Sequence, residues 1–205
     1  LKENKLATNV GDEGGFAPNF ESSTEILDEI MLSISEAGYV PGKNVSLALD
    51  VASSEFYENN YYNIEGEKLN NIEMSDYLIN LTQNYPILSI EDGLSEDDWA
   101  GWKYLTEKLG EKIQLVGDDL FVTQEKILQK GIDDGCANSI LVKVNQVGSV
   151  TETIDTMKLA EKNNYSSLVS HRSGETEDTF ISHLCVGTSS GQIKTGAPAR
   201  SERTA

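Results

Sequence analysis

The sequence predicts an α/β fold, a TIM-type β/α barrel of which about six of the eight strands are present. Six short apolar runs each end at a charged residue or a histidine, and these residues are Asp50, Glu91, Asp118, Lys143, His171 and Lys194. Successive members lie 23 to 41 residues apart, which is room for a strand, a helix and two loops. Because the ends of such strands converge on one face of a closed barrel, we expect a shared functional rim.

Local signals place the first elements in order. An apolar stripe over 23–37 predicts a helix, and a strand is expected at 45–49. Ser75 is the expected cap of a second helix, which Pro86 ends before a strand at 87–90.

The third helix has the strongest signals. Ser95 is its expected N-cap, and Gly110 is its expected end. Its predicted buried stripe consists of Trp99, Trp102, Leu105 and Leu109. Thr123, Ser149 and Thr176 are expected to open three further helices, each followed by an apolar strand. The tyrosine-rich stretch 57–62 lacks regular spacing and is expected to form a loop.

An open, doubly wound sheet is the alternative to a barrel. Such sheets usually carry a glycine-rich phosphate loop after the first strand, and none of the six strands is followed by one. We therefore favour a barrel and treat 1–205 as one partial domain. Since six strands cannot close an eight-stranded barrel, we expect two strands and the last helix to lie outside this chain, as part of a longer protein.

The net charge and the lengths of the apolar runs indicate which classes of binding partner are unfavourable. Lys and Arg number 16 against 34 Asp and Glu, which gives a formal net charge of −18 spread along the chain. This excess argues against nucleic acid or an anionic membrane surface as the main partner. No apolar run approaches the roughly 18 residues of a membrane span.

Acidic side chains at three successive strand ends suggest a metal site. Asp50, Glu91 and Asp118 offer hard oxygen ligands of the kind that suit Mg²⁺. For any one of them alone, a helix cap or a solvated loop acid is the favoured interpretation, and it is the three in phase that favour a metal site. Asp92 and Asp119 are left out of the set, because alternation along a continuing strand would turn them to the opposite side.

Two lysines at strand ends could take part in proton chemistry. Lys143 ends the most apolar strand and is either a snorkelling surface residue or a buried base. Beside a metal-bound carboxylate substrate it could remove a proton from the adjacent carbon. Lys194 offers a second cation against the developing oxyanion.

Two loops add further candidates. Arg172 and Ser173, after His171, could hold a phosphate where barrel enzymes commonly hold one. The alternative is an arginine paired with an acid of its own loop, namely Glu175, Glu177 or Asp178. Glu13, before two glycines, could bring a carboxylate over the rim, although an acid followed by glycines is also an ordinary turn.

Seven motifs together resemble the enolases, the phosphopyruvate hydratases, and occur in the family order. They are Gly11-Asp12-Glu13-Gly14-Gly15-Phe16-Ala17-Pro18-Asn19, Leu47-Ala48-Leu49-Asp50, Ser89-Ile90-Glu91-Asp92, Gly117-Asp118-Asp119-Leu120, Leu141-Val142-Lys143-Val144-Asn145-Gln146, Ser170-His171-Arg172-Ser173-Gly174-Glu175-Thr176-Glu177-Asp178 and Ile193-Lys194-Thr195-Gly196. The resemblance implies a reversible, Mg²⁺-dependent dehydration of 2-phosphoglycerate to phosphoenolpyruvate in glycolysis and gluconeogenesis.

The resemblance also implies a role for each candidate residue. Asp50, Glu91 and Asp118 would hold the tighter Mg²⁺, with the last two also beside the substrate. Lys143 would take the proton, Glu13 would protonate the departing hydroxide, and Lys194 would stabilise the intermediate. His171 would line the site, and Arg172 with Ser173 would bind the substrate phosphate. A lysine base with Mg²⁺ is the known pattern of enolase-superfamily sites.

The family pattern sets further expectations. Its members carry an amino-terminal lid domain and a barrel end that this chain lacks, so the chain alone is expected to be inactive. They form homodimers or larger rings in the cytoplasm, and some microbial members are secreted or bind plasminogen at the cell surface. Here Lys103, Lys108 or Lys112 could serve such binding. The other alternative is an enolase-superfamily enzyme that acts on a non-phosphorylated acid.

Overall fold

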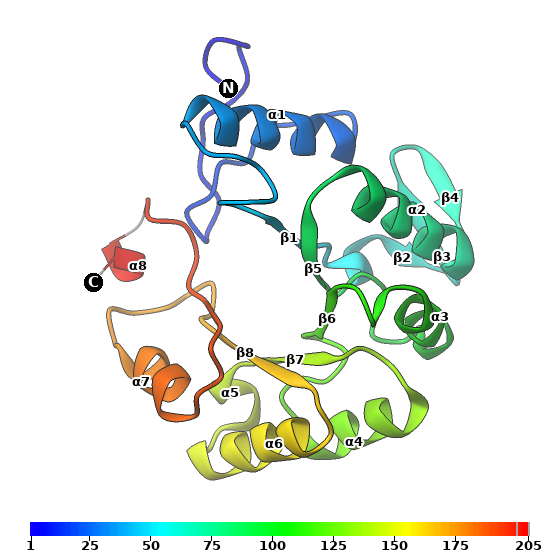
Figure 1. The fold of residues 1–205 in the computed structure, drawn as a ribbon, viewed down its shortest axis with the longest axis vertical. Coiled ribbons are helices and arrows are strands. Elements are labelled where there is room, and N and C mark those ends of the chain that lie inside the picture. The colour runs from blue at the N-terminus through cyan, green and yellow to red at the C-terminus, as the bar shows by residue number, and fades with distance from the viewer. Residues whose placement is uncertain (200, 205) are drawn as a thin grey trace.

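The computed structural model describes residues 1–199 and 201–204. Its main sheet is parallel, and its strands follow one another in chain order: β1 (Leu47–Asp50), β5 (Ile87–Glu91), β6 (Gln114–Gly117), β7 (Ser139–Val142), β8 (Ser166–Ser170) and β9 (Ile193–Lys194). The sheet curls, with helices on its outer side (Figure 1). The predicted six-stranded part of a β/α barrel is confirmed.

The helices alternate with these strands. The longer ones are α1 (Ser23–Glu36), α2 (Asn71–Asn84), α3 (Trp99–Leu109), α4 (Glu125–Asp134), α6 (Val150–Lys162) and α7 (Phe180–Gly187). The short ones are η1 (Ser53–Phe56), α5 (Val144–Val147) and α8 (Ser201–Thr204). Within the described ranges, no helix combines the length and the apolar character that a membrane crossing would need.

The prediction of a loop at the tyrosine-rich stretch was wrong. The segment forms a small antiparallel sheet of β2 (Tyr57–Glu58), β3 (Tyr61–Ile64) and β4 (Glu67–Leu69). Two-residue turns join its strands, with positive φ at Asn59 and Asn60 (54° and 64°) and at Glu65 and Gly66 (53° and 81°). Asparagine and glycine tolerate this left-handed backbone. Asn59, Asn60 and Gly66 were therefore the residues in the sequence that could have indicated these turns.

Four predicted helix starts, those at Ser75, Ser95, Thr123 and Thr176, were also misplaced. α2 begins after Asn70, which forms a capping box with Glu73, whereas Ser75 is buried inside the helix. α3 begins after Asp98, whose carboxylate accepts the Gly101 N–H. α7 begins after Thr179 rather than Thr176.

Neither Ser95 nor Thr123 caps the helix predicted for it. Ser95 is buried; its hydroxyl accepts the Asp97 N–H at 3.3 Å in the turn before α3, and its backbone N–H donates to the Tyr62 hydroxyl at 3.1 Å. Thr123 is fully buried two residues before α4. Ser149 does cap α6, as predicted, by accepting the Glu152 N–H.

The core lies between the sheet and its helices. Trp102 is fully buried, and its indole N–H donates to the carbonyls of Leu94 and Ser95. Leu105 and Leu109 continue the predicted buried stripe, whereas Trp99 is only partly buried under the Lys130 ammonium. Each large apolar side chain buried here contributes about 1.5–3 kcal/mol to folding.

Neutral polar side chains join the amino-terminal ends of the strands inside the barrel. The Gln114 amide nitrogen lies 3.2 Å from Ser139 Oγ, 2.8 Å from Ser166 Oγ and 2.8 Å from Gln192 Oε1. The Ser89 hydroxyl donates to Oε1 of the Gln114 side chain at 3.1 Å. This network satisfies polar groups of neighbouring strands without any charge.

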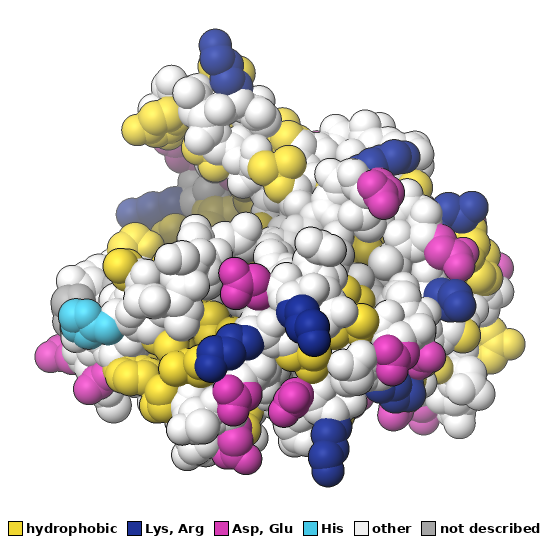
Figure 2. All heavy atoms as spheres, turned by 60° about the horizontal axis from the view of Figure 1, so that its bottom comes forward, with side chains coloured by type: hydrophobic (Ala, Val, Ile, Leu, Met, Phe, Trp, Pro, Cys, Tyr) yellow, Lys and Arg dark blue, Asp and Glu magenta, His cyan; other side chains and the backbone are white. Residues whose placement is uncertain are grey.

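On the outside, acidic and basic side chains are interspersed. Figure 2 shows the face that includes the lower part of Figure 1, with both charge signs scattered between hydrophobic patches. No single-sign basic surface dominates this view, in keeping with the acidic composition.

Candidate active site

The parallel register brings three acidic residues to adjacent strand ends. Asp50 at the end of β1 lies opposite Glu91 at the end of β5. Glu91 in turn lies opposite Val116 of β6, and Asp118 follows two residues later. Glu91 and Asp118 are buried, with 5% and 7% of their surface exposed. The arrangement forms an acidic rim at the carboxyl ends of the strands.

Lys194 reaches this rim from the far edge of the sheet. Its ammonium lies 2.6 Å from Asp50 Oδ2 and 2.7 Å from Glu91 Oε1. β9 and β1 are the two opposite edges of the sheet, so these contacts cross the curled interior. The sequence predicted both the acids and the lysine, and the structure brings them together.

Lys143 forms a second lysine–carboxylate pair. Its ammonium contacts Asp118 Oδ2, and Gln146 Nε2 lies 3.3 Å from the other oxygen, Oδ1. The Lys143 side chain is only 16% exposed, so it is not a snorkelling surface lysine. Each strand-end lysine therefore holds at least one of the three predicted acids.

Asp92 and Asp119 were left out of the predicted set on the condition that the strand continues, and this condition does not hold. β5 ends at Glu91, and Asp92 has a φ of 41°, which breaks the alternation assumed for a continuing strand. Asp92 accepts the backbone N–H groups of Asp118 and Asp119, both at 2.9 Å. Ligand oxygens of Asp92, Asp118 and Asp119 lie within 4.8 Å of one another, as a group that could hold a metal ion.

A sequence signal for this second set was present. Two acidic residues stand side by side at consecutive strand ends, Glu91-Asp92 and Asp118-Asp119. Strand alternation separates such neighbours only while the strand lasts. The left-handed backbone at Asp92 ends it.

Burial and repulsion between carboxylates raise the pKa values of Glu91 and Asp92. The pKa of Glu91 is raised to about 8, first by burial and then by the charge of Asp50, although Lys194 opposes the shift. Burial raises the pKa of Asp92 to about 7, against the two backbone N–H groups that lower it. Full ionisation of these carboxyl groups is therefore unfavourable without further positive charge, which a bound cation would supply.

Burial and nearby charges shift the pKa of Lys194 in opposite directions. Burial lowers its pKa, but the charges of Glu91 and Asp50 outweigh burial, and the net pKa is raised. Lys194 therefore stays protonated and acts as a fixed positive charge on the rim.

Glu13 and His171 meet on the same side. Glu13 Oε1 lies 3.4 Å from Nε2 of His171, which is 2% exposed at the end of β8. The Glu13 carbonyl accepts the Ala197 N–H at 2.8 Å, which ties this loop to the segment after β9. The long-range pairing of Glu13 with His171 was not visible in the sequence.

Arg172 and Ser173 lie on the exposed loop after β8. The Arg172 guanidinium donates to Asn145 Oδ1 at 3.0 Å. The backbone N–H of Arg172 donates to the Glu175 carboxylate at 3.0 Å. Glu175 thus contacts the backbone of Arg172. Asn145 is a contact that the sequence did not predict, although it lies two residues after Lys143.

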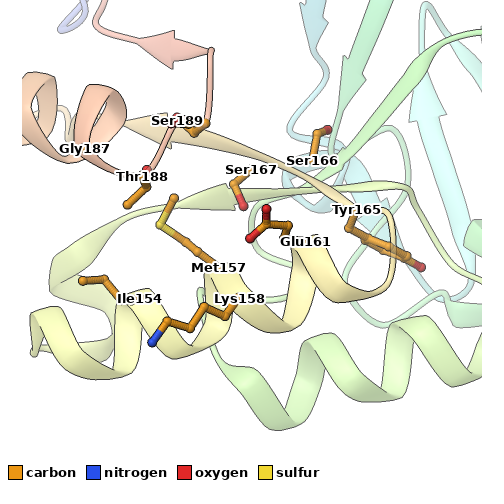
Figure 3. A pocket seen from close by; sticks show the side chains of 11 residues that line it. Ile154, Met157, Lys158, Glu161, Tyr165, Ser166, Ser167, Gly187, Thr188 and Ser189 are labelled. Atoms are coloured by element: carbon orange, nitrogen blue, oxygen red, sulfur yellow. The ribbon is translucent and has the colours of Figure 1, made fainter.

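A separate cavity of about 430 Å³ lies between α6, the start of β8 and the segment after α7 (Figure 3). Ser166 and Ser167, from the amino-terminal end of β8, line it together with Met157 of α6. This places the cavity at the opposite end of β8 from His171. It takes no part in the charged rim.

The whole sequence, residues 1–205, matches the family model described as "Enolase, C-terminal TIM barrel domain". The chain belongs to this family. Membership agrees with the parallel curled sheet and supports an enolase-superfamily enzyme with lyase-type activity. The group formed by Asp92, Asp118 and Asp119 could hold a metal ion.

Proposed function

We propose that the protein is a Mg²⁺-dependent phosphopyruvate hydratase, which dehydrates 2-phosphoglycerate reversibly to phosphoenolpyruvate in glycolysis and gluconeogenesis. The observation that carries this proposal is the pair of lysines, Lys143 and Lys194, that converge on strand-end carboxylates of an enolase-family barrel. The identity of the substrate rests on the motif resemblance.

The residues fit a hard divalent cation. Asp50, Glu91 and Asp118 would hold Mg²⁺, with Asp92 and Asp119 beside them. The Lys194 ammonium already lies between Asp50 and Glu91, so these carboxylates accept positive charge between them. When bound, Mg²⁺ would neutralise the substrate carboxylate and make the proton on the adjacent carbon more acidic.

Lys143 is the proposed base. In its neutral form, its amine takes the proton from the carbon that bears the phosphate, and the bonding electrons move into the substrate carboxylate. Lys194 contributes a fixed positive charge against the resulting oxyanion. Asp118 holds the Lys143 amine at the rim, which limits its motion before proton transfer.

Glu13 is the proposed acid. It gives its proton to the hydroxyl group on the neighbouring carbon as that carbon–oxygen bond breaks, so that water leaves and the double bond forms. His171 lies against the Glu13 carboxylate and can orient it. Arg172 and Ser173 are proposed to bind the phosphate, because they lie on the loop after β8, where barrel enzymes often hold one.

Other proposals concern the wider protein. Oligomerisation as a homodimer or larger ring, a cytoplasmic location, and secretion or surface display with plasminogen binding all stay predictions. Lys103, Lys108 and Lys112 are exposed, as such surface binding would need. An enolase-superfamily enzyme for non-phosphorylated acids is the second candidate, and Arg172 beside the rim favours the phosphorylated substrate.

The test is Mg²⁺-dependent formation of phosphoenolpyruvate from 2-phosphoglycerate, run in parallel on the 205-residue chain and on the complete gene product. We expect turnover by the complete product that stops when Mg²⁺ is chelated. If the complete product turns over a non-phosphorylated hydroxy acid instead, the superfamily alternative is correct. If it forms no phosphoenolpyruvate at any Mg²⁺ concentration, the proposed function is wrong.

A further inference from the structure

A closed ring of contacts connects Lys143 to Asp118 by two routes. The direct route is the contact between the Lys143 ammonium and Asp118 Oδ2. The second route begins at the Lys143 backbone N–H, which donates to Thr123 Oγ1 at 2.9 Å. Thr123 Oγ1 lies 2.7 Å from Gln146 Oε1, and Gln146 Nε2 lies 3.3 Å from Asp118 Oδ1. Two neutral side chains therefore connect the proposed base to a proposed metal ligand.

The donors and acceptors in this ring allow only one arrangement of its hydrogen bonds. An ionised Asp118 only accepts hydrogen bonds, so Gln146 must turn its NH₂ group toward it. The Gln146 carbonyl oxygen then faces Thr123 and accepts from the hydroxyl. Because the hydroxyl proton is used in this way, the oxygen of Thr123 is left to accept from the Lys143 N–H. Each member can make its contacts only with this amide orientation.

The loop that carries Thr123 is held in an unfavourable conformation. Val122 and Thr123 have φ values of 43° and 56°, and a positive φ is a genuine outlier for β-branched residues. Thr123 is also 0% exposed, and its carbonyl accepts from Thr156 of α6 at 3.2 Å. Its hydroxyl lies 3.3 Å from the Leu141 carbonyl as well. Such strain persists only where the surroundings hold it, and it concentrates at functional sites.

We propose that Thr123 and Gln146 are positioning residues that orient the Asp118 carboxylate for the divalent cation and hold the Lys143 main chain for proton abstraction. This inference rests on the proposed function. Neither residue touches the reacting atoms. Their effect is to restrict rotation of the carboxylate and movement of the turn that follows β7, as outer hydrogen bonds do for metal ligands.

The experiment measures Mg²⁺ affinity by calorimetry and steady-state kinetics in the complete gene product. We expect Thr123→Val to weaken Mg²⁺ binding by about 10- to 100-fold. At saturating Mg²⁺ it should lower kcat while leaving KM for 2-phosphoglycerate unchanged, because the proposed phosphate contacts lie on another loop. Thr123→Ser keeps the hydroxyl and should restore both values.

Gln146→Leu provides a second variant in case Thr123→Val does not fold. Gln146 is only half-buried, and the change removes just its link between Thr123 and Asp118. It should weaken Mg²⁺ binding in the same direction.

Matched controls exist at other places in the barrel. The Thr106 hydroxyl of α3 donates to the Trp102 carbonyl and, like that of Thr123, accepts a backbone N–H, from Ala137 at 2.8 Å, but it lies away from the rim. Gln129 of α4 donates to the carboxylate of Asp133 at 2.8 Å on the outer surface. Thr106→Val and Gln129→Leu should leave Mg²⁺ affinity unchanged.

The proposal is overturned if folded Thr123→Val and Gln146→Leu bind Mg²⁺ as tightly as the unmodified protein. An equal loss in Thr106→Val would overturn it too, because the effect would then be general destabilisation. A protein that binds Mg²⁺ but does not act on 2-phosphoglycerate would refute the proposed function alone. The affinities of the variants would still decide the role of Thr123 and Gln146 toward Asp118.

Discussion

The two ends of the barrel strands are built from different chemistry. At the amino-terminal ends, Gln114 links neutral hydroxyl and amide groups of neighbouring strands. At the carboxyl ends, Lys143 and Lys194 lie among the acids Asp50, Glu91 and Asp118. The same parallel register thus supports an uncharged network at one end and a crowded charged rim at the other.

The difference shows where the fold favours stability and where it supports function. Neutral hydrogen bonds between satisfied groups each contribute about 0.5–1.5 kcal/mol to folding. Buried charges cost desolvation energy that their pairing only partly offsets. A rim of such groups is therefore better explained by catalysis than by stability. Changes at the rim should alter activity and metal binding, and changes at Gln114 should alter stability.

The largest effect is expected from Lys143→Ala. Loss of a positioned base should lower kcat by about 10²- to 10⁴-fold. Steady-state turnover of 2-phosphoglycerate by the complete gene product measures it. Lys158→Ala is the control, because Lys158 pairs with Asp155 at 3.5 Å on the exposed face of α6. Full turnover by Lys143→Ala would exclude Lys143 as the base.

Asp118→Ala should give the next largest effect. It removes a proposed ligand and frees the Lys143 ammonium, so the Mg²⁺ concentration for half-maximal activity should rise at least ~10-fold. A Mg²⁺ titration of activity gives this value, with Asp155→Ala as the control. An unchanged titration curve would remove Asp118 from the metal site.

Gln114→Leu tests the opposite end of the barrel. It leaves hydroxyls of Ser139 and Ser166 without their amide partner, so the free energy of unfolding should fall by about 1–3 kcal/mol. Urea denaturation monitors this, and Mg²⁺ affinity should not change. If Mg²⁺ affinity fell together with stability, the separation between the two ends would not hold.

Asp92→Asn should give the smallest effect, a change in the pH dependence of stability. The pKa of Asp92 is raised from its ordinary 3.8 to about 7, so the folded state binds this proton more tightly than the unfolded chain does. The resulting stabilisation is complete below the unfolded pKa and is lost as the pH rises through the folded pKa. The free energy of unfolding of the unmodified protein should therefore decrease as the pH rises from 3.8 to about 7.

The variant lacks this titration, so its urea midpoint should change less with pH over the same window. Asp97→Asn, at an exposed position before α3, should keep the slope of the unmodified protein. Equal slopes in all three proteins would show that Asp92 does not titrate in this range.

Much of the fold was predictable because the apolar runs are short and regular. Strand ends at Asp50, Glu91 and Lys194 follow directly from such runs. Helix starts were harder, since the Thr123 hydroxyl contacts residues distant in the chain and the Ser95 hydroxyl caps only the turn before α3. Propensity favours a cap locally, but it cannot show which partner arrives from elsewhere in the chain.

The candidate site was predictable in its members but not in its contacts. Strand ends and motifs indicated Lys143 and Asp118, while their link through Thr123 joins residues 20 positions apart along the chain. Asp92 was left out of the predicted set, because the prediction assumed a continuing strand that its left-handed backbone ends. Such conformations are set by the surrounding structure.

The central claim is that Lys143 removes the substrate proton before Glu13 assists departure of the hydroxide. Exchange of the hydrogen next to the carboxylate of 2-phosphoglycerate with solvent deuterium, followed by NMR, separates these steps. In the complete gene product, Glu13→Gln should still exchange this hydrogen while forming almost no phosphoenolpyruvate, and Lys143→Ala should do neither. Exchange that continues in Lys143→Ala at the unmodified rate would contradict the account.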